Sequence, residues 1–133
     1  MMFRIPNHKP LTALEQLLMN YVWANPGCTA EACREGVAND RALKDSTIRT
    51  VLRKLEEKGY ATHSVVGRTY VYRPADSKRN AAVEAARQLI ERFCNGSVED
   101  FVVGLVDNQV VDARELQRLA ERISARKEGR GRA

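Results

Sequence analysis

The sequence predicts a mainly α-helical protein with one small β-hairpin, an α+β fold in which helices dominate. Three observations lead to this fold class. Apolar residues recur at helical spacing in six segments of the 133-residue chain. The period changes once, between residues 60 and 74, where β-branched and aromatic residues flank a Gly-Arg pair. Hydrophobic residues make up 44% of the chain, yet no apolar run approaches the roughly 20 residues of a membrane-spanning helix.

The first two segments predict helices that begin at threonine caps. LTALEQLLMNYVWA is striped by apolar residues, Thr12 can cap it, and an Asn-Pro-Gly run ends it. Trp23 extends the apolar stripe, so we expect it to pack in the core. TAEACREGVAN follows with Thr29 as its cap, and Gly36 costs this helix about 1 kcal/mol relative to alanine.

The third segment, STIRTVLRKLEEKG, predicts a helix from Ser46 to Gly59 that Asp45 or Ser46 would cap. Its apolar residues fall at i, i+3, i+4 and i+7, and they are Ile48, Val51, Leu52 and Leu55. The opposite face carries the polar and basic residues Ser46, Arg49, Thr50, Arg53 and Lys54. A helix that only packed into a core would not need three bases turned outward.

A hairpin follows this helix directly. YATHSVV and TYVYRP flank Gly67-Arg68, a turn signal that places Arg68 at the tip, and Pro74 ends the second strand. Three helices and then a two-stranded hairpin is the order of a winged helix-turn-helix. In that geometry the third helix enters the DNA major groove and the wing reaches the backbone or the minor groove.

The rest of the chain predicts three more amphipathic helices. We expect a winged-helix DNA-binding domain at residues 1–75, a helical dimerisation domain at 76–126 and a disordered basic tail at 127–133. The dimerisation helices have little else to bury against, so their natural partner is a second copy of the chain. The residues expected in that contact are Leu89, Ile90, Phe93, Phe101, Val102, Leu105, Leu116, Leu119 and Ile123.

The charge pattern points to the front half as the part that binds an anion. Formal net charge is +5, and residues 1–75 hold 11 basic and 7 acidic residues. Arg49 and Thr50 are expected to face base edges, because arginine can bond guanine in two-pronged fashion. Thr47, Arg53 and Arg68 would hold phosphates, and Ser46 can join Thr47 at the helix N-terminus.

Two alternatives stay open beside this interpretation. The basic helix face could be solvated and bind nothing, and the last helices could fold back on their own DNA-binding domain. A different class of function is also open, a winged-helix protein-interaction module without specific DNA binding. Such modules usually lack basic residues on the third helix.

The sequence gives no reason to expect an enzyme, a cofactor or a metal site. It has two histidines, no phosphate-binding glycine loop and no H-E-x-x-H motif. The three cysteines, Cys28, Cys33 and Cys94, are odd in number and two fall on apolar stripes, so we expect them to be structural. A Cys28–Cys33 pair that senses an oxidant stays open as an alternative. The N-terminal segment lacks the layout of a signal peptide, and we expect a cytoplasmic protein that does not enter the membrane.

The motifs LTALEQLLMNYVW, STIRTVLRKLEEKGY, GRTYVYRP and FCNGSVEDFVVGLVD with ARELQRLAERI resemble those of the penicillinase-repressor (BlaI/MecI-type) family. The resemblance runs from Leu11 to about Ile123. It implies a homodimeric bacterial repressor of palindromic operators with TACA/TGTA-like halves. It also implies that DNA is contacted by the matching residues of the recognition helix and wing, which are Thr47, Arg49, Thr50, Arg53, Arg68 and Tyr70.

The chain departs from the family where the release signal acts. Members in β-lactam resistance are cut at an Asn-Phe bond in the dimerisation helix, and Gly104-Leu105 stands there in this chain. A regulatory protease that cuts in this helix is left open by the resemblance, although this difference counts against it. Copper-responsive relatives carry a C-terminal C-x-C cluster, which the tail ARKEGRGRA lacks.

Overall fold

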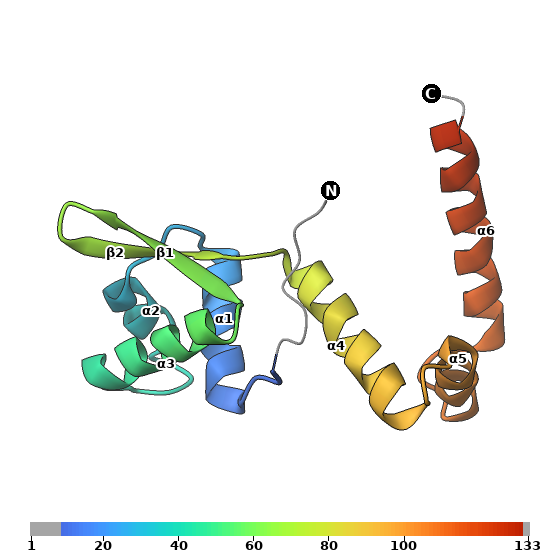
Figure 1. Cartoon of the computed structure of the whole chain (residues 1–133), viewed down its shortest axis with the longest axis horizontal. Helices are drawn as coiled ribbons and strands as arrows, with labels where there is room; N and C mark the ends of the chain where they lie inside the picture. Colours follow the sequence, from blue (N-terminus) through green and yellow to red (C-terminus); the bar gives the residue numbers. More distant parts are fainter. Residues whose placement is uncertain (1–8, 132–133) are drawn as a thin grey trace. The chain divides into compact units, whose positions relative to one another are not determined.

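The computed structural model describes residues 9–131, which form six α-helices and one two-stranded sheet (Figure 1). The elements follow in the order α1, α2, α3, β1, β2, α4, α5 and α6, so the fold class is the mainly helical α+β class predicted. They divide into two compact units, Met1–Gln88 and Leu89–Ala133. The first unit thus continues past residue 75, where we expected the winged-helix domain to end.

Two threonines cap α1 (Ala13–Ala24) and α2 (Ala30–Gly36), as predicted. The Thr12 hydroxyl accepts the backbone N–H of Glu15 at 3.2 Å, and the Glu15 carboxylate accepts the backbone N–H of Thr12 at 2.9 Å. This is a complete capping box, which satisfies two N–H groups that a helix end leaves open. The Thr29 hydroxyl does the same for one N–H of α2, at 3.1 Å.

α3 spans Asp45–Glu57, and its first turn differs from the prediction. The N-cap is Lys44, whose side chain makes no capping hydrogen bond, so the prediction that Asp45 or Ser46 caps this helix is wrong. Asp45 lies inside the helix, where its carboxylate accepts a hydrogen bond from Arg49 Nε at 3.0 Å. A carboxylate in the first turn is already favoured by the helix dipole and by an arginine four residues on.

The wing is an antiparallel hairpin of β1 (Ala61–Val66) and β2 (Thr69–Pro74). Gly59 ends the preceding helix with φ +87°, and Gly67 opens the turn with φ +66°. Both values lie in the left-handed region that a residue without Cβ adopts most cheaply. Arg68 completes the two-residue turn, at the tip of the hairpin as predicted.

The core of the first unit lies where α1, α2, α3 and the base of the hairpin meet. Its largest fully buried side chains are Leu18, Met19, Val22, Cys33, Ile48, Leu52 and Leu55. The segment before α2 pairs with β2, because Gly27 donates to the Tyr72 carbonyl and Tyr72 donates to the Cys28 carbonyl, both at 2.8 Å. The base of the wing is therefore hydrogen-bonded to the chain that leads into α2.

α1 and α2 approach closely at Gly36. A Cβ atom on Gly36 would lie 2.0 Å from Cε1 of Tyr21, far inside any van der Waals contact. α2 ends here, earlier than the predicted segment, with Val37 as its C-cap. The glycine that weakens this helix is thus required by the packing of α1 against it.

The first turns of α4 (Lys78–Phe93) belong to the first unit. Trp23 packs against the core, as predicted, and its indole N–H donates to the Asp76 carbonyl at 3.0 Å. Glu84 is buried, and one of its carboxylate oxygens lies 3.4 Å from Arg87 Nε. Ala81 of α4 packs against the core, and Lys78 Nζ lies 5.7 Å from the centroid of the Trp23 ring, so the first turn of α4 contacts the rest of the first unit.

The second unit holds the end of α4, α5 (Val98–Asp107) and α6 (Ala113–Gly131). Asn95 and Gly96 have positive φ and separate α4 from α5. None of the described side chains in this unit is buried. Among residues 9–131 no helix combines the length and apolar character needed to cross a membrane.

The predicted disordered tail from residue 127 is contradicted over the part that the structure describes, because α6 continues to Gly131. Lys127, Glu128 and Arg130 are good helix formers and no proline interrupts them, whereas Gly129 and Gly131 disfavour helix. The last two residues of that predicted tail lie outside the described residues.

Candidate nucleic-acid interface

α3 separates its apolar and basic residues as predicted. Ile48, Val51, Leu52 and Leu55 are buried. The predicted DNA-binding residues on the other side are exposed, except for the half-buried Thr47, and they are Ser46, Arg49, Thr50, Arg53 and Lys54. The helix therefore presents three bases to solvent across two successive turns.

Arg49 is held in place by its neighbour on the helix. Its guanidinium bonds the Asp45 carboxylate at 3.0 Å, with side chains that are 67% and 56% exposed. The hydrogen bond and the charge of Asp45 hold the pKa of Arg49 above its ordinary value, so the side chain stays cationic. An ion pair this exposed adds little to stability, but it orients a guanidinium that a phosphate or a base edge could bind instead.

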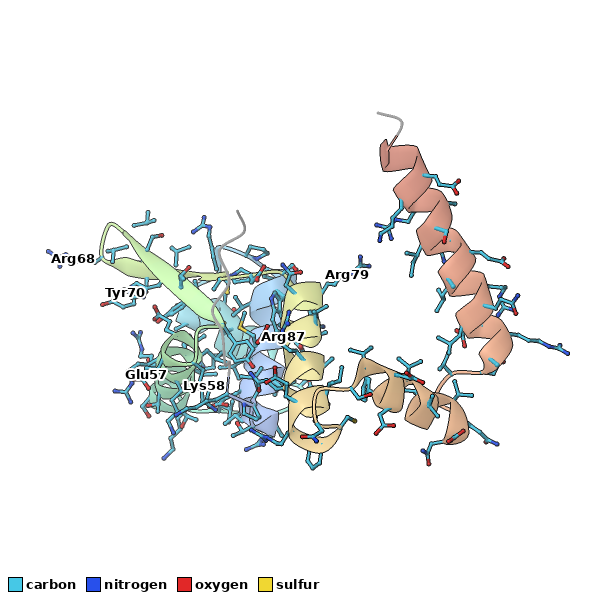
Figure 2. The ribbon with its side chains drawn as sticks, turned by 45° about the vertical axis from the view of Figure 1, so that its right-hand side comes forward. Glu57, Lys58, Arg68, Tyr70, Arg79 and Arg87 are labelled. Atoms are coloured by element: carbon cyan, nitrogen blue, oxygen red, sulfur yellow. The ribbon has the colours of Figure 1, made fainter. Side chains whose placement is uncertain are left out.

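The wing carries its basic residue at the tip and an aromatic residue beside it. Figure 2 shows Arg68 extending outward from the hairpin turn, with Tyr70 on the strand next to it. Tyr70 is 48% exposed, and its ring stacks on His63 with centroids 4.1 Å apart and planes 8° from parallel. Such stacking fixes the ring while leaving its hydroxyl edge open to a partner.

A contact between α3 and the wing holds this stack. His63 Nδ1 lies 2.6 Å from the Glu56 carboxylate, so one residue of the recognition helix is joined to the strand that supports Tyr70. Neither Glu56 nor His63 was among the predicted site residues. Alternation of residues along the strands could have predicted which face of the hairpin carries His63. The contact with Glu56 also requires the hairpin to lie over the end of α3, and only the fold shows this.

An open hollow of about 650 Å³ lies between α2, α3 and the wing. Three predicted residues line it, namely Arg49 from α3 and Arg68 and Tyr70 from the wing. Thr29 and Glu31 at the start of α2 line it too, and neither was among the predicted DNA-binding residues. The fold thus brings two arginines that are 19 residues apart in the chain to one concave surface.

The end of α3 is anchored to α1. Lys58 Nζ lies 2.6 Å from the Glu15 carboxylate and donates to the Pro10 carbonyl at 3.1 Å. Burial raises the pKa of Glu15, but the hydrogen bonds from Lys58 and Thr12 and the charge of Lys58 outweigh it, so the pKa lies below its ordinary value. Lys58 marks the C-terminal end of α3 in Figure 2.

None of the three cysteines lines this hollow. Cys28 precedes α2 and Cys33 lies within it, both are buried, Cys94 is half-buried after α4, and all three are free thiols. No group of three or more histidine, cysteine, aspartate or glutamate side chains is placed to hold a metal ion among residues 9–131.

The predicted dimerisation residues are open to solvent to different degrees. Exposed are Leu89, Phe93, Leu119 and Ile123, and half-buried are Ile90, Phe101, Val102, Leu105 and Leu116. Phe93 is 74% exposed, and Val98 and Val110 exceed 59%. Large apolar side chains this exposed are typical of surfaces that interact with another molecule.

Comparison with known proteins agrees with this architecture. Residues 11–125 match the family described as "Penicillinase repressor". The penicillinase repressor of Bacillus licheniformis is 22% identical over 102 residues, which cover 77% of this chain and 80% of that protein.

Two solved structures are similar as well. One is described as the solution structure of the DNA-binding domain of the repressor BlaI (22% identity, TM-score 0.49, 56% of this chain and 90% of that one). The other is described as monomeric Bacillus licheniformis BlaI in complex with the blaP half-operator (21% identity, TM-score 0.48, 57% and 93%). Because the family match covers most of its length, this chain belongs to the penicillinase-repressor family of winged-helix, DNA-binding transcriptional regulators.

Proposed function

We propose that this protein represses transcription as a homodimer on a palindromic operator with TACA/TGTA-like halves, contacted by α3 and the wing. The observation that carries the proposal is the grouping of Arg49, Arg68 and Tyr70 around one open hollow between α3 and the hairpin. A concave surface with a basic residue on each side fits a polyanionic ribbon better than a small ligand.

Within this surface the residues take different roles. Arg49 and Thr50 lie on the exposed face of α3, so they would read base edges in the major groove. Arg68 at the wing tip would hold a phosphate, and Tyr70 beside it would contact the sugar-phosphate backbone. The remaining exposed polar residues of α3 would bond phosphates on either side of the groove, and they are Ser46, Thr47, Arg53 and Lys54.

The dimer follows from the second unit. Its helices expose Phe93, Leu119 and Ile123, and no described side chain there is buried. A second copy would supply the missing apolar partner and place two recognition helices about one DNA turn apart, roughly 34 Å. Two-fold symmetry of the protein then requires a palindromic site.

DNA binding is tested by fluorescence anisotropy with DNA from the gene's own upstream region, beside a scrambled duplex, at several salt concentrations. Arg49→Ala is expected to cost about 1–3 kcal/mol on the operator and to relax specificity. Arg68→Ala should weaken binding to every sequence and reduce the salt slope by about 1. Arg114→Ala, an exposed arginine on α6, is the matched control that should change neither.

Two results would contradict these roles. An equal loss on both duplexes for Arg49→Ala would make it a phosphate contact, and an unchanged salt slope for Arg68→Ala would remove the wing from the interface. Weak and equal binding of the unmodified protein on the upstream DNA calls for a genome-wide selection of bound fragments. A failure to enrich any sequence there would refute specific repression.

The alternative function is a protein-interaction module, which the exposed apolar surface of the second unit would also suit. Size-exclusion chromatography with light scattering separates the two, because only the repressor mechanism requires a dimer. A monomer at micromolar concentration that binds no operator would favour the interaction module.

A further inference from the structure

Two buried thiols lie side by side at the start of α2. The Sγ atoms of Cys28 and Cys33 are 3.6 Å apart, and the residues are 7% and 0% exposed. Thr29 caps the helix between them, so they occupy the positions before the cap and four residues after it. Two apolar side chains commonly pack at these positions and fix how the chain enters a helix. Here both members of that contact are oxidisable.

The distance between the sulfurs is close to what a bond requires. A disulfide joins sulfurs at about 2.05 Å, so they must approach by roughly 1.5 Å, a change that side-chain rotation and a small shift of the first turn can supply. Cys94 follows α4 and has no thiol neighbour among the described residues. The chain therefore holds one pair poised for an intramolecular bond and one thiol that can serve as an internal comparison.

We propose that Cys28 and Cys33 form a reversible oxidation site that takes a peroxide as its oxidant and closes a disulfide across the first turn of α2. The Cys28 thiolate attacks one peroxide oxygen, the O–O bond breaks, and the alcohol or water leaves after taking a proton. Cys33 then attacks the Cys28 sulfenic acid and releases water. Overall, two thiols and one peroxide give one disulfide, one alcohol or water from the peroxide, and one further water.

The two thiols are not equivalent in this sequence of steps. The hydrogen bond between them lowers the pKa of Cys28, because the Cys33 S–H donates to the Cys28 thiolate, and the same bond together with burial raises the pKa of Cys33. Cys28 also has the larger exposed fraction of the two. Cys28 is thus the thiol that meets the oxidant, and Cys33 is the thiol that resolves the sulfenic acid.

The site lies next to the base of the wing without belonging to the surface proposed to contact DNA. The Cys28 carbonyl accepts the backbone N–H of Tyr72, and Tyr72 belongs to β2. A disulfide would therefore join Cys33 in α2 covalently to Cys28, whose carbonyl is hydrogen-bonded to β2. Among the described residues, no other pair of thiols lies between α2 and β2.

The experiment treats the reduced full-length chain with hydrogen peroxide, then alkylates it in denaturant so that every remaining thiol reacts, and measures intact and peptide masses. The expected product has lost the mass of two hydrogen atoms, has Cys28 and Cys33 protected from alkylation, and regains both thiols after treatment with dithiothreitol. Cys94→Ser should give the same product, because Cys94 takes no part. Circular dichroism of each variant confirms that it is folded.

Single variants test the order of the steps. Cys33→Ala cannot close the bond, so a sulfenic acid should accumulate at Cys28, where dimedone traps it. Cys28→Ala should leave Cys33 untrapped, because that thiol is buried and keeps its proton. Alkylation of both cysteines as in untreated protein, or oxidation that appears first at Cys94 while the pair stays reduced, would overturn the proposal.

Discussion

The ion pair between Glu15 and Lys58 links α1 to the end of α3, and its contribution to stability can be measured. Glu15 is 4% exposed, and one of its oxygens accepts both Lys58 Nζ at 2.6 Å and the Thr12 N–H at 2.9 Å. Glu15→Gln keeps the shape and the acceptor but removes the charge. The perturbation therefore isolates the electrostatic part of this anchor.

The expected loss follows from what remains after the change. A hydrogen bond to a charged group is worth about 1.5–3 kcal/mol, and breaking a fully buried pair costs about 3–5 kcal/mol. The Lys58 side chain is 20% exposed and keeps its bond to the Pro10 carbonyl, so it can regain water. We expect Glu15→Gln to lower the free energy of unfolding by about 1.5–3 kcal/mol at pH 7.

The pH dependence gives a second and sharper readout. Because the folded pKa of Glu15 lies below its ordinary value of 4.5, the folded state binds fewer protons than the unfolded state there. This contribution is complete above pH 4.5 and is lost as pH falls through the folded pKa. The difference between native protein and Glu15→Gln should therefore shrink below pH 4.5.

The assay is urea denaturation followed by the fluorescence of Trp23, the single tryptophan of the chain, which lies in the same unit. Lys58→Met and the double variant complete a mutant cycle, whose coupling energy reports the pair itself. A loss under about 0.5 kcal/mol at pH 7, the size of an ordinary surface change, would refute the anchor. A difference that stays constant down to pH 3 would refute the role of the Glu15 charge.

Three further predictions concern packing, the wing and the second unit. Gly36→Ala should destabilise the first unit, because overpacking against Tyr21 costs about 1–3 kcal/mol against a gain of about 1 kcal/mol in helix propensity. The same fluorescence assay measures it, and increased stability would mean that the ring moves aside freely. His63→Ala should weaken binding to operator and scrambled DNA alike, since it releases Tyr70 from its stack; in anisotropy titrations, a loss on the operator alone would contradict this. Phe93→Asp should convert the dimer to a monomer by light scattering while circular dichroism stays unchanged, and a persistent dimer would exclude Phe93 from the interface.

Local signals were sufficient to predict the elements. Apolar residues at helical spacing predicted all six helices, and the change of period predicted the hairpin, because these patterns reflect which side of each element is buried. The caps at Thr12 and Thr29 were predictable since their partners lie within three residues. The exposed position of Arg49 and Arg53 on α3 followed from the same periodicity.

The predictions that failed or stayed incomplete involve residues with two possible partners, or partners that lie far apart in the chain. Asp45 could bond the helix end or Arg49, and the sequence does not say which of these partners wins. The tail was judged by its charge, whereas α6 continues through it as far as Gly131. The contact of α4 with the rest of the first unit places Lys78 over the ring of Trp23, which lies on α1 far back in the chain.

The sequence by itself determined the order of the elements, the basic face of α3 and the family to which the chain belongs, because each is written in local pattern. Only the tertiary structure decided which residues meet. It brought Arg49 and Arg68 to one hollow, joined Glu56 to His63, and placed Cys28 next to the base of the wing. The physical reason is that hydrophobic burial selects the face of each element, while close packing of those faces selects the contacts between residues far apart in the chain.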